Sequence, residues 1–179
     1  MKKLSKVLAV LLAMLMMFGI IPMTASAADT YTVKYNPNGG SGSMTNSTFT
    51  FDTEVELRAN RFTRLGYTFL GWSKDRLATT ATYTDQQSVT NVAEAGATTV
   101  TLYAIWAPNT FTVQFNANGG EGTMANQVFT YDVGQALTAN TFTREGYTFE
   151  GWAKTASARF TDYTDQQSVK NLTTTNQGT

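Results

Sequence analysis

The chain has 179 residues, and its 13 basic and 13 acidic side chains give a formal net charge of zero at pH 7. It contains no His and no Cys, which removes the commonest general base, the commonest metal ligand and any disulfide framework. No basic stripe is present to neutralise phosphates, so nucleic acid is not an expected partner.

The first 27 residues have the pattern of a secretory signal. Three lysines among the first six residues precede an apolar run from Val7 to Ile21, and Ala25-Ser26-Ala27 supplies the small residues that a signal peptidase reads. The alternative, a membrane anchor, needs an apolar run of about 20 residues. We therefore predict a signal peptide at residues 1–27, whose removal leaves ten basic and thirteen acidic residues. The mature protein is expected to be secreted or at the cell surface, without membrane insertion.

The remaining chain contains one sequence unit twice, offset by 80 residues. The copies align without a gap from Tyr31 with Phe111 to Thr99 with Thr179. A fixed period indicates that one supersecondary unit is built twice. We predict a first module at residues 28–107 and a second at 108–179, and we call the two copies the first and second repeats.

Each repeat opens with a strand and a turn. Apolar and polar residues alternate from Tyr31 to Tyr35 and again from Phe111 to Phe115, the period of a half-buried strand. Asn36–Gly40 and Asn116–Gly120 follow, and Asn-Gly favours a turn because both residues tolerate positive φ. These loops lack the spaced Asp residues of a calcium site and the Lys-Ser/Thr of a phosphate loop.

The segment Ser47–Leu57 reads as a strand, a turn at Asp52-Thr53 and a second strand. Glu54 and Glu56 have no acidic counterparts in the second repeat, which favours a solvated face over a site. The following residues, Asn60–Arg64, are expected to form a short turn or a single helical turn.

The most distinctive stretch is Gly66–Trp72, which recurs as Gly146–Trp152. Tyr67 and Phe69 share one face of a strand, and Gly71 allows a bulge that re-aims Trp72. One interpretation is an aromatic core in which each ring buries about 150–250 Å². The other is an exposed aromatic platform for glycan stacking. The flanking glycines favour the core.

An unchanged block follows, Tyr83–Val89 and Tyr163–Val169. Thr84 or Asp85 is suited to cap a short helix that runs to about Asn91. Asp85 and its copy Asp165 are the carboxylates that both blocks share. We interpret them as capping residues and not as catalytic acids.

A strand from Val100 to Trp106 closes the first repeat, and Ala107–Thr110 reads as a four-residue link. The second repeat reaches Thr179, the counterpart of Thr99, before this strand. Such a strand buries three or four apolar side chains, and each contributes roughly 1.5–3 kcal/mol to the free energy of folding. Without the strand, the neighbouring sheet edge is unpaired. We therefore expect the chain to be the amino-terminal part of a longer repeat protein or the product of a truncated gene.

The combined motifs resemble the Listeria–Bacteroides repeat, also called the internalin B repeat. Its pattern is a strand ending in Asn-Gly-Gly, a Thr-Arg-x-Gly-Tyr-Thr-Phe-x-Gly-Trp block and a closing Leu-Tyr-Ala-x-Trp. Here these are Tyr35–Gly40, Thr63–Trp72 and Leu102–Trp106; the second repeat has Phe115–Gly120 and Thr143–Trp152.

The resemblance implies an α+β, mostly β fold of tandem β-grasp-like, ubiquitin-related modules with little helix. Such modules occur in large exported bacterial proteins, commonly in the cell envelope, and serve as spacers, adhesion or interaction modules. No catalytic residues are associated with them. We therefore predict no enzyme activity and no catalytic, cofactor-binding or metal site, with neighbouring repeats and an unidentified protein or glycan as partners. The alternative function is a carbohydrate- or cell-wall-binding module that uses exposed aromatic side chains.

The incomplete second repeat generates a stability prediction. Residues 28–107 expressed alone should unfold cooperatively, whereas residues 108–179 should be unstable until a strand like Val100–Trp106 is appended, because the closing strand supplies buried apolar side chains. Thermal unfolding followed by circular dichroism tests this. Equally sharp melting of the two fragments would contradict it.

Overall fold

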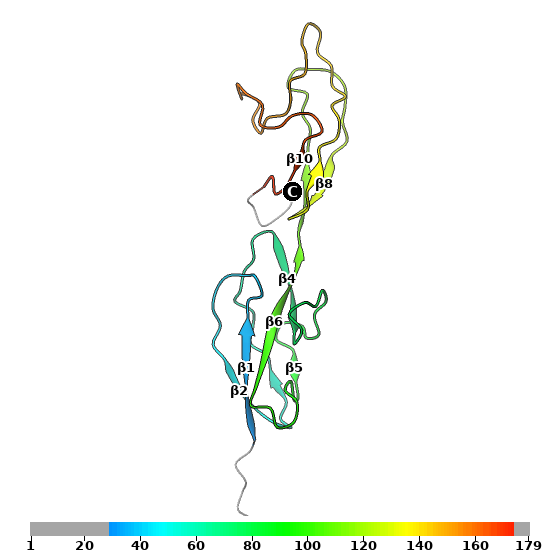
Figure 1. The fold of residues 1–179 in the computed structure, drawn as a ribbon. Helices are drawn as coiled ribbons and strands as arrows, with labels where there is room; N and C mark the ends of the chain where they lie inside the picture. The colour runs from blue at the N-terminus through cyan, green and yellow to red at the C-terminus, as the bar shows by residue number, and fades with distance from the viewer. Residues whose placement is uncertain (1–28, 174–179) are drawn as a thin grey trace, which may run out of the picture.

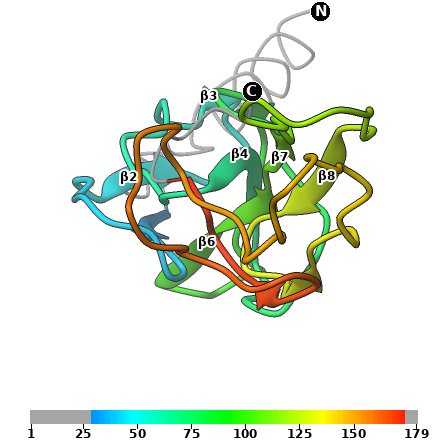
Figure 2. The same cartoon turned by 90° about the horizontal axis from the view of Figure 1, so that it is seen from above.

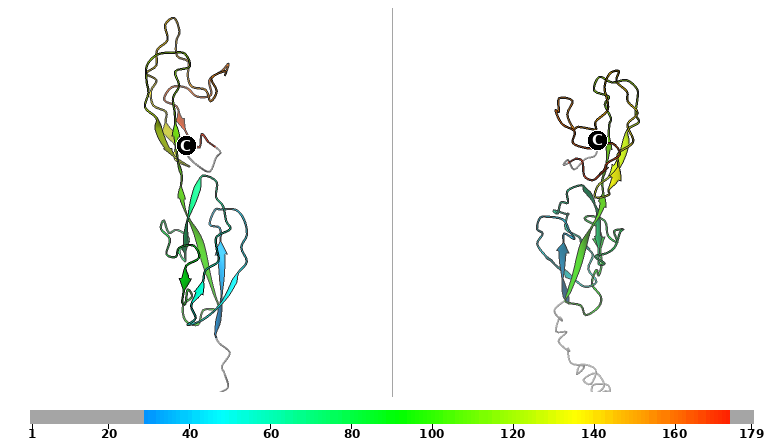
Figure 3. Two further views of the ribbon diagram at one scale, coloured as in Figure 1. Left: turned by 180° about the vertical axis from the view of Figure 1, so that it is seen from behind. Right: turned by 45° about the horizontal axis from the view of Figure 1, so that its top comes forward.

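A computed structural model describes residues 29–173, which form two repeats lying end to end along one axis (Figures 1 and 3). Viewed along that axis, the second repeat lies over the first (Figure 2). Residues 29–173 contain ten strands and no helix, which confirms the mostly β expectation. No helix in this range is long and apolar enough to cross a membrane. The predicted signal peptide, residues 1–27, lies outside the described residues.

A four-stranded sheet forms the first repeat, in the order β2-β1-β6-β4. β6 is central: it runs parallel to β1 along one edge and antiparallel to β4 along the other. A two-stranded ladder packs beside this sheet. The strands of the sheet are β1 (Thr30–Asn36), β2 (Ser47–Thr50), β4 (Tyr67–Ser73) and β6 (Thr99–Pro108), and those of the ladder are β3 (Val55–Glu56) and β5 (Ser88–Val89).

The predicted aromatic core of the first repeat is confirmed, and Trp72 is at its centre. Trp72 is fully buried, as are Leu102 and Ala104 of the central strand. The rings of Tyr35 and Phe69 lie 5.0 Å from Trp72, both in edge-to-face contact, a favoured aromatic geometry. The apolar residues that alternate along β1 are buried against this cluster.

Gly71 produces the predicted bulge. The pairing between β4 and β6 changes register between Phe69 and Gly71, and Gly71 has a φ of 138°. A Cβ at this position would overlap the carbonyl oxygen of Tyr83. The bulge turns Trp72 into the core, where its backbone N–H donates to the Tyr83 carbonyl at 2.7 Å.

The helix predicted from Thr84 or Asp85 to Asn91 is wrong. The segment forms a turn and then β5, and Gln86 and Asn91 have positive φ values of 56° and 54°, which an α-helix cannot accommodate. Asp85 accepts a hydrogen bond from the Asn60 N–H at 2.9 Å and so joins two loops. Asp165 does the same for Asn140 at 2.9 Å.

The other short connections are also extended or turned. The helical turn expected as one possibility for Asn60–Arg64 is absent, and Thr63 instead forms an isolated bridge with Ser41. The short turn, the other possibility, is present at Asn60, whose side-chain oxygen accepts from the Phe62 N–H at 2.9 Å. The predicted Asn-Gly turns are confirmed, with φ values of 47° at Asn38 and 46° at Asn118. The predicted four-residue link is reduced to Asn109, because Ala107 and Pro108 continue to pair with β4.

The second repeat forms two short ladders and lacks counterparts of β4 and β6 among the described residues. β7 (Thr110–Val113) pairs with β8 (Gln127–Thr130), and β9 (Gln135–Ala136) pairs with β10 (Ser168–Val169). Residues 147–151 form no strand, and Trp152 makes only an isolated bridge with Tyr163. Tyr147 is 68% exposed and Phe149 is 39% exposed. The second copy of the aromatic stretch is therefore only partly a core.

The bulge generates a stability prediction. Gly71→Ala should destabilise the first repeat by about 3 kcal/mol, because backbone strain of about 1–3 kcal/mol adds to overpacking of similar size. Gly96→Ala is the control: its φ is 79°, but a Cβ there meets no atom within 4 Å, so only about 1 kcal/mol of left-handed strain is expected. Urea unfolding measures both. Equal losses would show that the close approach to Tyr83 is unimportant.

Candidate functional site: the junction between the repeats

Asn109 is the single residue between β6 and β7, and it bonds to both repeats. Its N–H donates to the Gly66 carbonyl at 2.8 Å, and its own carbonyl accepts from the Tyr131 N–H at 2.9 Å. The Thr68 hydroxyl donates to its side-chain oxygen at 2.6 Å. Gly66 and Thr68 belong to the first repeat and Tyr131 to the second. The chain therefore crosses between repeats through a fixed residue and not through a free linker.

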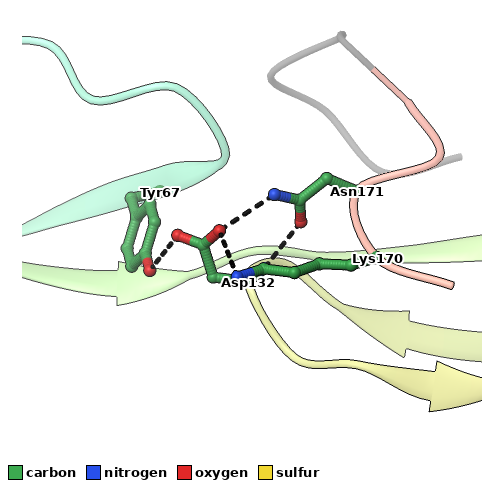
Figure 4. Close-up of polar contacts among 4 residues, drawn as sticks. All are labelled: Tyr67, Asp132, Lys170 and Asn171. Carbon is green, nitrogen blue, oxygen red and sulfur yellow. Dashed lines mark hydrogen bonds and ion pairs between the residues drawn. The ribbon is translucent and has the colours of Figure 1, made fainter. Parts of the chain in front are cut away.

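A side-chain hydrogen bond joins the repeats beside Asn109 (Figure 4). The Tyr67 hydroxyl, at the start of β4, donates to Asp132 Oδ2 at 2.9 Å. Asn171 donates to the other carboxylate oxygen at 2.9 Å and accepts from the Asp132 N–H at 2.7 Å. Lys170 lies 3.4 Å from the carboxylate, but this pair is exposed and contributes little. Asp132 is held by its own repeat and presents one oxygen to Tyr67.

Aromatic packing completes the junction. The rings of Tyr67 and Tyr131 lie 5.9 Å apart at 75°, an edge-to-face contact. The Arg64 guanidinium lies 3.7 Å from the centroid of the Tyr67 ring, within the range of a cation–π interaction. Gly66 has a φ of 75°, and a Cβ on it would overlap the Tyr131 ring. Close approach of the repeats at this point therefore requires glycine.

The two hydrogen-bonded groups have shifted pKa values. Burial and the hydrogen bond to Asp132 raise the pKa of Tyr67 above its usual 10.0. Hydrogen bonds from Asn171 and from Tyr67 lower the pKa of Asp132 below its usual 3.8. Both shifts favour the protonation states that make the hydrogen bond, a neutral phenol and an ionised carboxylate.

The Asp132–Asn171 pair is a property of each repeat and not of the junction alone. In the first repeat Asp52 and Asn91 make the same reciprocal hydrogen bonds, at 2.8 and 2.7 Å. All four residues have positive φ values between 52° and 62°. The sequence predicts Asp52 only as a turn residue, although the Asp and the Asn recur in both copies. Their joint recurrence was the signal that could have identified the pair.

The residues singled out in the sequence do not assemble into a reactive centre. Glu56 is exposed and accepts a hydrogen bond from Gln86 at 3.0 Å, and Asp85 and Asp165 join loops. Within residues 29–173, no group of three or more His, Cys, Asp or Glu side chains is placed to hold a metal ion. In the first copy of the aromatic stretch Trp72 lies in the core and Tyr67 at the junction. In the second copy Tyr147 and Phe149 are exposed. The contacts between the repeats hold them in a fixed relation.

Comparison with known proteins gives one family and two relatives. A family model described as the Listeria-Bacteroides repeat domain matches residues 31–105 and 111–175. A "Putative Gly-rich membrane protein" of Evansella cellulosilytica is 32% identical over 92 residues, 50% of this chain and 11% of that protein. A "Putative membrane protein" of the same organism is 31% identical over 124 residues, 68% of this chain and 17% of that protein. The chain therefore corresponds to a small part of each relative. No solved structure matches it.

The junction generates a prediction about the Asp132 carboxyl group. Tyr67→Phe should move its pKa up towards 3.8, because the mutation removes a hydrogen bond to the charged form. A carboxyl-detected NMR titration measures this. Tyr147→Phe alters the equivalent but exposed tyrosine and should leave the Asp132 pKa unchanged. An unchanged pKa in Tyr67→Phe would contradict the hydrogen bond.

The same shifts predict how the junction depends on pH. The pKa of Asp132 is lower in the folded protein, so its contribution is complete above pH 3.8 and is lost as the pH falls through the lowered value. The pKa of Tyr67 is raised, so its contribution is complete below pH 10.0 and is lost as the pH rises through the raised value. Amide chemical shifts of Tyr131 and Asn109 should be constant between these limits and change outside them. A change near neutral pH would contradict the assignment.

Proposed function

Since the chain belongs to the Listeria-Bacteroides repeat domain family, we propose that it is a non-catalytic spacer or interaction segment of an exported bacterial protein. It would act as a stalk that holds neighbouring parts at a set distance. The predicted signal peptide and the relatives' descriptions as membrane proteins support a place at the cell envelope. Modules at residues 28–107 and 108–179 would be the repeating units.

The observation that carries this proposal is the junction. A spacer has to resist bending where its units meet, and here β6 and β7 are separated by one residue that bonds to both sides. The Tyr67–Asp132 hydrogen bond and the Tyr67–Tyr131 contact oppose rotation about that residue. Connections this short restrict the orientations available to neighbouring units.

The strand order supports the finer fold assignment, a β-grasp-like module. Such folds place the first and last strands in parallel at the centre of a mixed sheet, and β1 and β6 have this relation. In ubiquitin-related folds a helix covers the sheet. Among the described residues of the first repeat there is no helix, and loops and the β3–β5 ladder accompany the four-stranded sheet instead. We therefore propose a helix-free variant of that architecture.

The spacer function is tested by measuring the distance between the repeats. The chain has no Cys, so Thr48→Cys and Val128→Cys, two exposed positions in equivalent strands, can be spin-labelled selectively. Pulsed electron paramagnetic resonance should give one narrow distance distribution. A broad wild-type distribution would exclude a rigid spacer.

Matched glycine variants show whether the junction sets that distance. Gly66→Ala should broaden the distribution, because its Cβ would displace the Tyr131 ring. Gly146→Ala introduces the same strain at the same φ of 75° but meets no atom within 4 Å, and should leave the distribution narrow. Equal broadening in both variants would assign the effect to backbone strain alone.

A second candidate function is carbohydrate or cell-wall binding, favoured by the exposed Tyr147, Phe149 and Phe160. Aromatic rings at the surface can stack on sugar rings. A peptidoglycan pull-down with the full chain tests this candidate, with Phe160→Ala as the informative variant because that side chain is 87% exposed. Retention that depends on Phe160 would support it, and no retention would exclude it.

A further inference from the structure

The loop between Trp72 and Tyr83 differs between the repeats far more than its surroundings do. Residues 73–82 share two of ten positions with residues 153–162, whereas the ten residues before the loop share eight and the seven after it share all seven. The closure of the loop is the same in both copies. Trp72 and Tyr83 exchange backbone hydrogen bonds at 2.7 and 2.9 Å, and their counterparts do so at 2.8 and 3.0 Å. We call these two segments the variable loops.

The Asn-Gly turn holds the middle of each variable loop. The Asn38 side-chain amide donates to the Arg76 carbonyl at 3.0 Å, and Asn118 donates to the equivalent Ala156 carbonyl at 3.1 Å. Both contacts are to the backbone, so they fix the path of the loop without specifying its side chains. A loop whose path is already fixed loses less conformational entropy when it binds a partner. The same frame therefore presents two different sets of side chains.

Each variable loop exposes a large apolar side chain. Leu77 is 77% exposed and Phe160 is 87% exposed, the two highest values among the large apolar side chains of residues 29–173. Leu77 belongs to the first repeat, whose sheet includes the central strand β6. Thr80, the counterpart of Phe160 in that repeat, is exposed as well. The exposure is therefore a property of the loop and does not depend on whether a central strand is present.

An exposed arginine precedes each of these apolar side chains, Arg76 before Leu77 and Arg159 before Phe160. The two pairs stand at different places in the loop, because Arg76 aligns with Ala156. The loops thus carry the same combination of chemistries although their sequences differ. Within residues 29–173 neither arginine forms an ion pair. Each guanidinium can therefore bind a carboxylate through two hydrogen bonds.

The carboxylates of the variable loops are already engaged within the loops. Asp75 accepts a hydrogen bond from the N–H two residues later at 2.9 Å, and Asp162 accepts from the Lys154 N–H at 2.8 Å. Lys74 pairs with Glu94 at 3.0 Å. The arginine and the apolar side chain are consequently the groups that both loops offer to a partner.

Two other classes of partner fit this combination less well. A sugar ring stacks on an aromatic face, and Leu77 has none. A bilayer surface attracts basic and apolar side chains together. The two loops, however, project on opposite sides of the long axis of the molecule (Figures 1 and 3), so one flat surface cannot meet both. An acidic polypeptide segment can supply a carboxylate and an apolar contact to each loop separately.

We propose that each variable loop binds a polypeptide segment in which a carboxylate side chain lies next to an apolar one. The carboxylate would pair with Arg76 or Arg159, and the apolar side chain would cover Leu77 or Phe160. Because Leu77 and Phe160 differ in size and shape, the two loops would select different segments. The inference rests on the interaction role in the proposed function and is independent of the spacer role.

A phage-displayed library of random linear peptides, selected on immobilised residues 28–179, tests this proposal. Enriched peptides should contain Asp or Glu beside an aromatic or aliphatic residue. Each should bind one charge-reversed loop, Arg76→Glu or Arg159→Glu, at least about tenfold more weakly than the original chain, because an interface arginine commonly carries much of the binding free energy. The other variant should leave its affinity unchanged. Fluorescence polarisation measures these affinities.

Matched variants separate the two contacts from general charge effects. Lys34→Glu reverses an exposed charge on β1, outside the variable loops, and should leave the affinity of every enriched peptide unchanged. Leu77→Ser and Phe160→Ser should weaken the peptides of their own loop, because the apolar contact is lost while the arginine remains. Thermal unfolding should be the same in all variants, since the mutated side chains are exposed.

The proposal is overturned if no peptide is enriched, if the enriched peptides lack acidic residues, or if they bind the charge-reversed loops as tightly as the original. Loop-dependent binding of phosphatidylglycerol vesicles or of peptidoglycan fragments, without peptide binding, would overturn it in favour of a membrane or a glycan partner. A broad inter-repeat distance distribution would exclude the rigid spacer and leave this inference intact.

Discussion

The first repeat depends on one central strand that pairs along both of its edges. Without β6, the β1–β2 hairpin and β4 share no hydrogen-bonded neighbour, and Trp72 loses the adjacent Leu102 and Ala104. The second repeat shows what remains in that case. Its first hairpin and its small ladder persist, but residues 147–151 form no strand. Pairing on two edges therefore organises the aromatic residues as much as their own hydrophobicity does.

The same strand also makes the connection between repeats. β6 leaves the sheet, passes through Asn109 and continues as β7, so the orientation of the second repeat is tied to a strand in the core of the first. Tyr67 lies opposite Pro108, at the last pair of the β4–β6 ladder. Its ring and hydroxyl contact Tyr131 and Asp132 of the second repeat. Core and junction are thus consecutive parts of one ladder.

Features set by neighbouring residues could be predicted from the sequence. The alternation along β1 and β6, the Asn38-Gly39 turn and the bulge at Gly71 all follow from local preferences. The role of Asp85 could not be predicted, because a helix cap and a bond to a distant loop need the same residue type; its partner Asn60 lies 25 positions away. Tyr67 and Asp132 are 65 positions apart, and their contact depends on how two folded units meet. Tyr147 is exposed whereas its counterpart Tyr67 packs on Tyr131 of the second repeat, so its exposure too depends on how folded units meet and not on its own surroundings in sequence.

The junction joins two different surfaces, which gives the array a polarity. The first repeat contributes Gly66 and Tyr67 to the junction, and the second contributes Tyr131 and Asp132. Each repeat also carries the counterpart of the other surface, and these counterparts, Asp52 in the first repeat and Tyr147 in the second, are exposed. Head-to-tail contacts of this kind apply the same rotation and translation at every step; they form a ring where the rotation closes and an open helical array where it does not, whereas two-fold contacts close on themselves. Further units joined in this way would add equal increments of length, and the geometry at Asn109 would fix the rotation from one unit to the next.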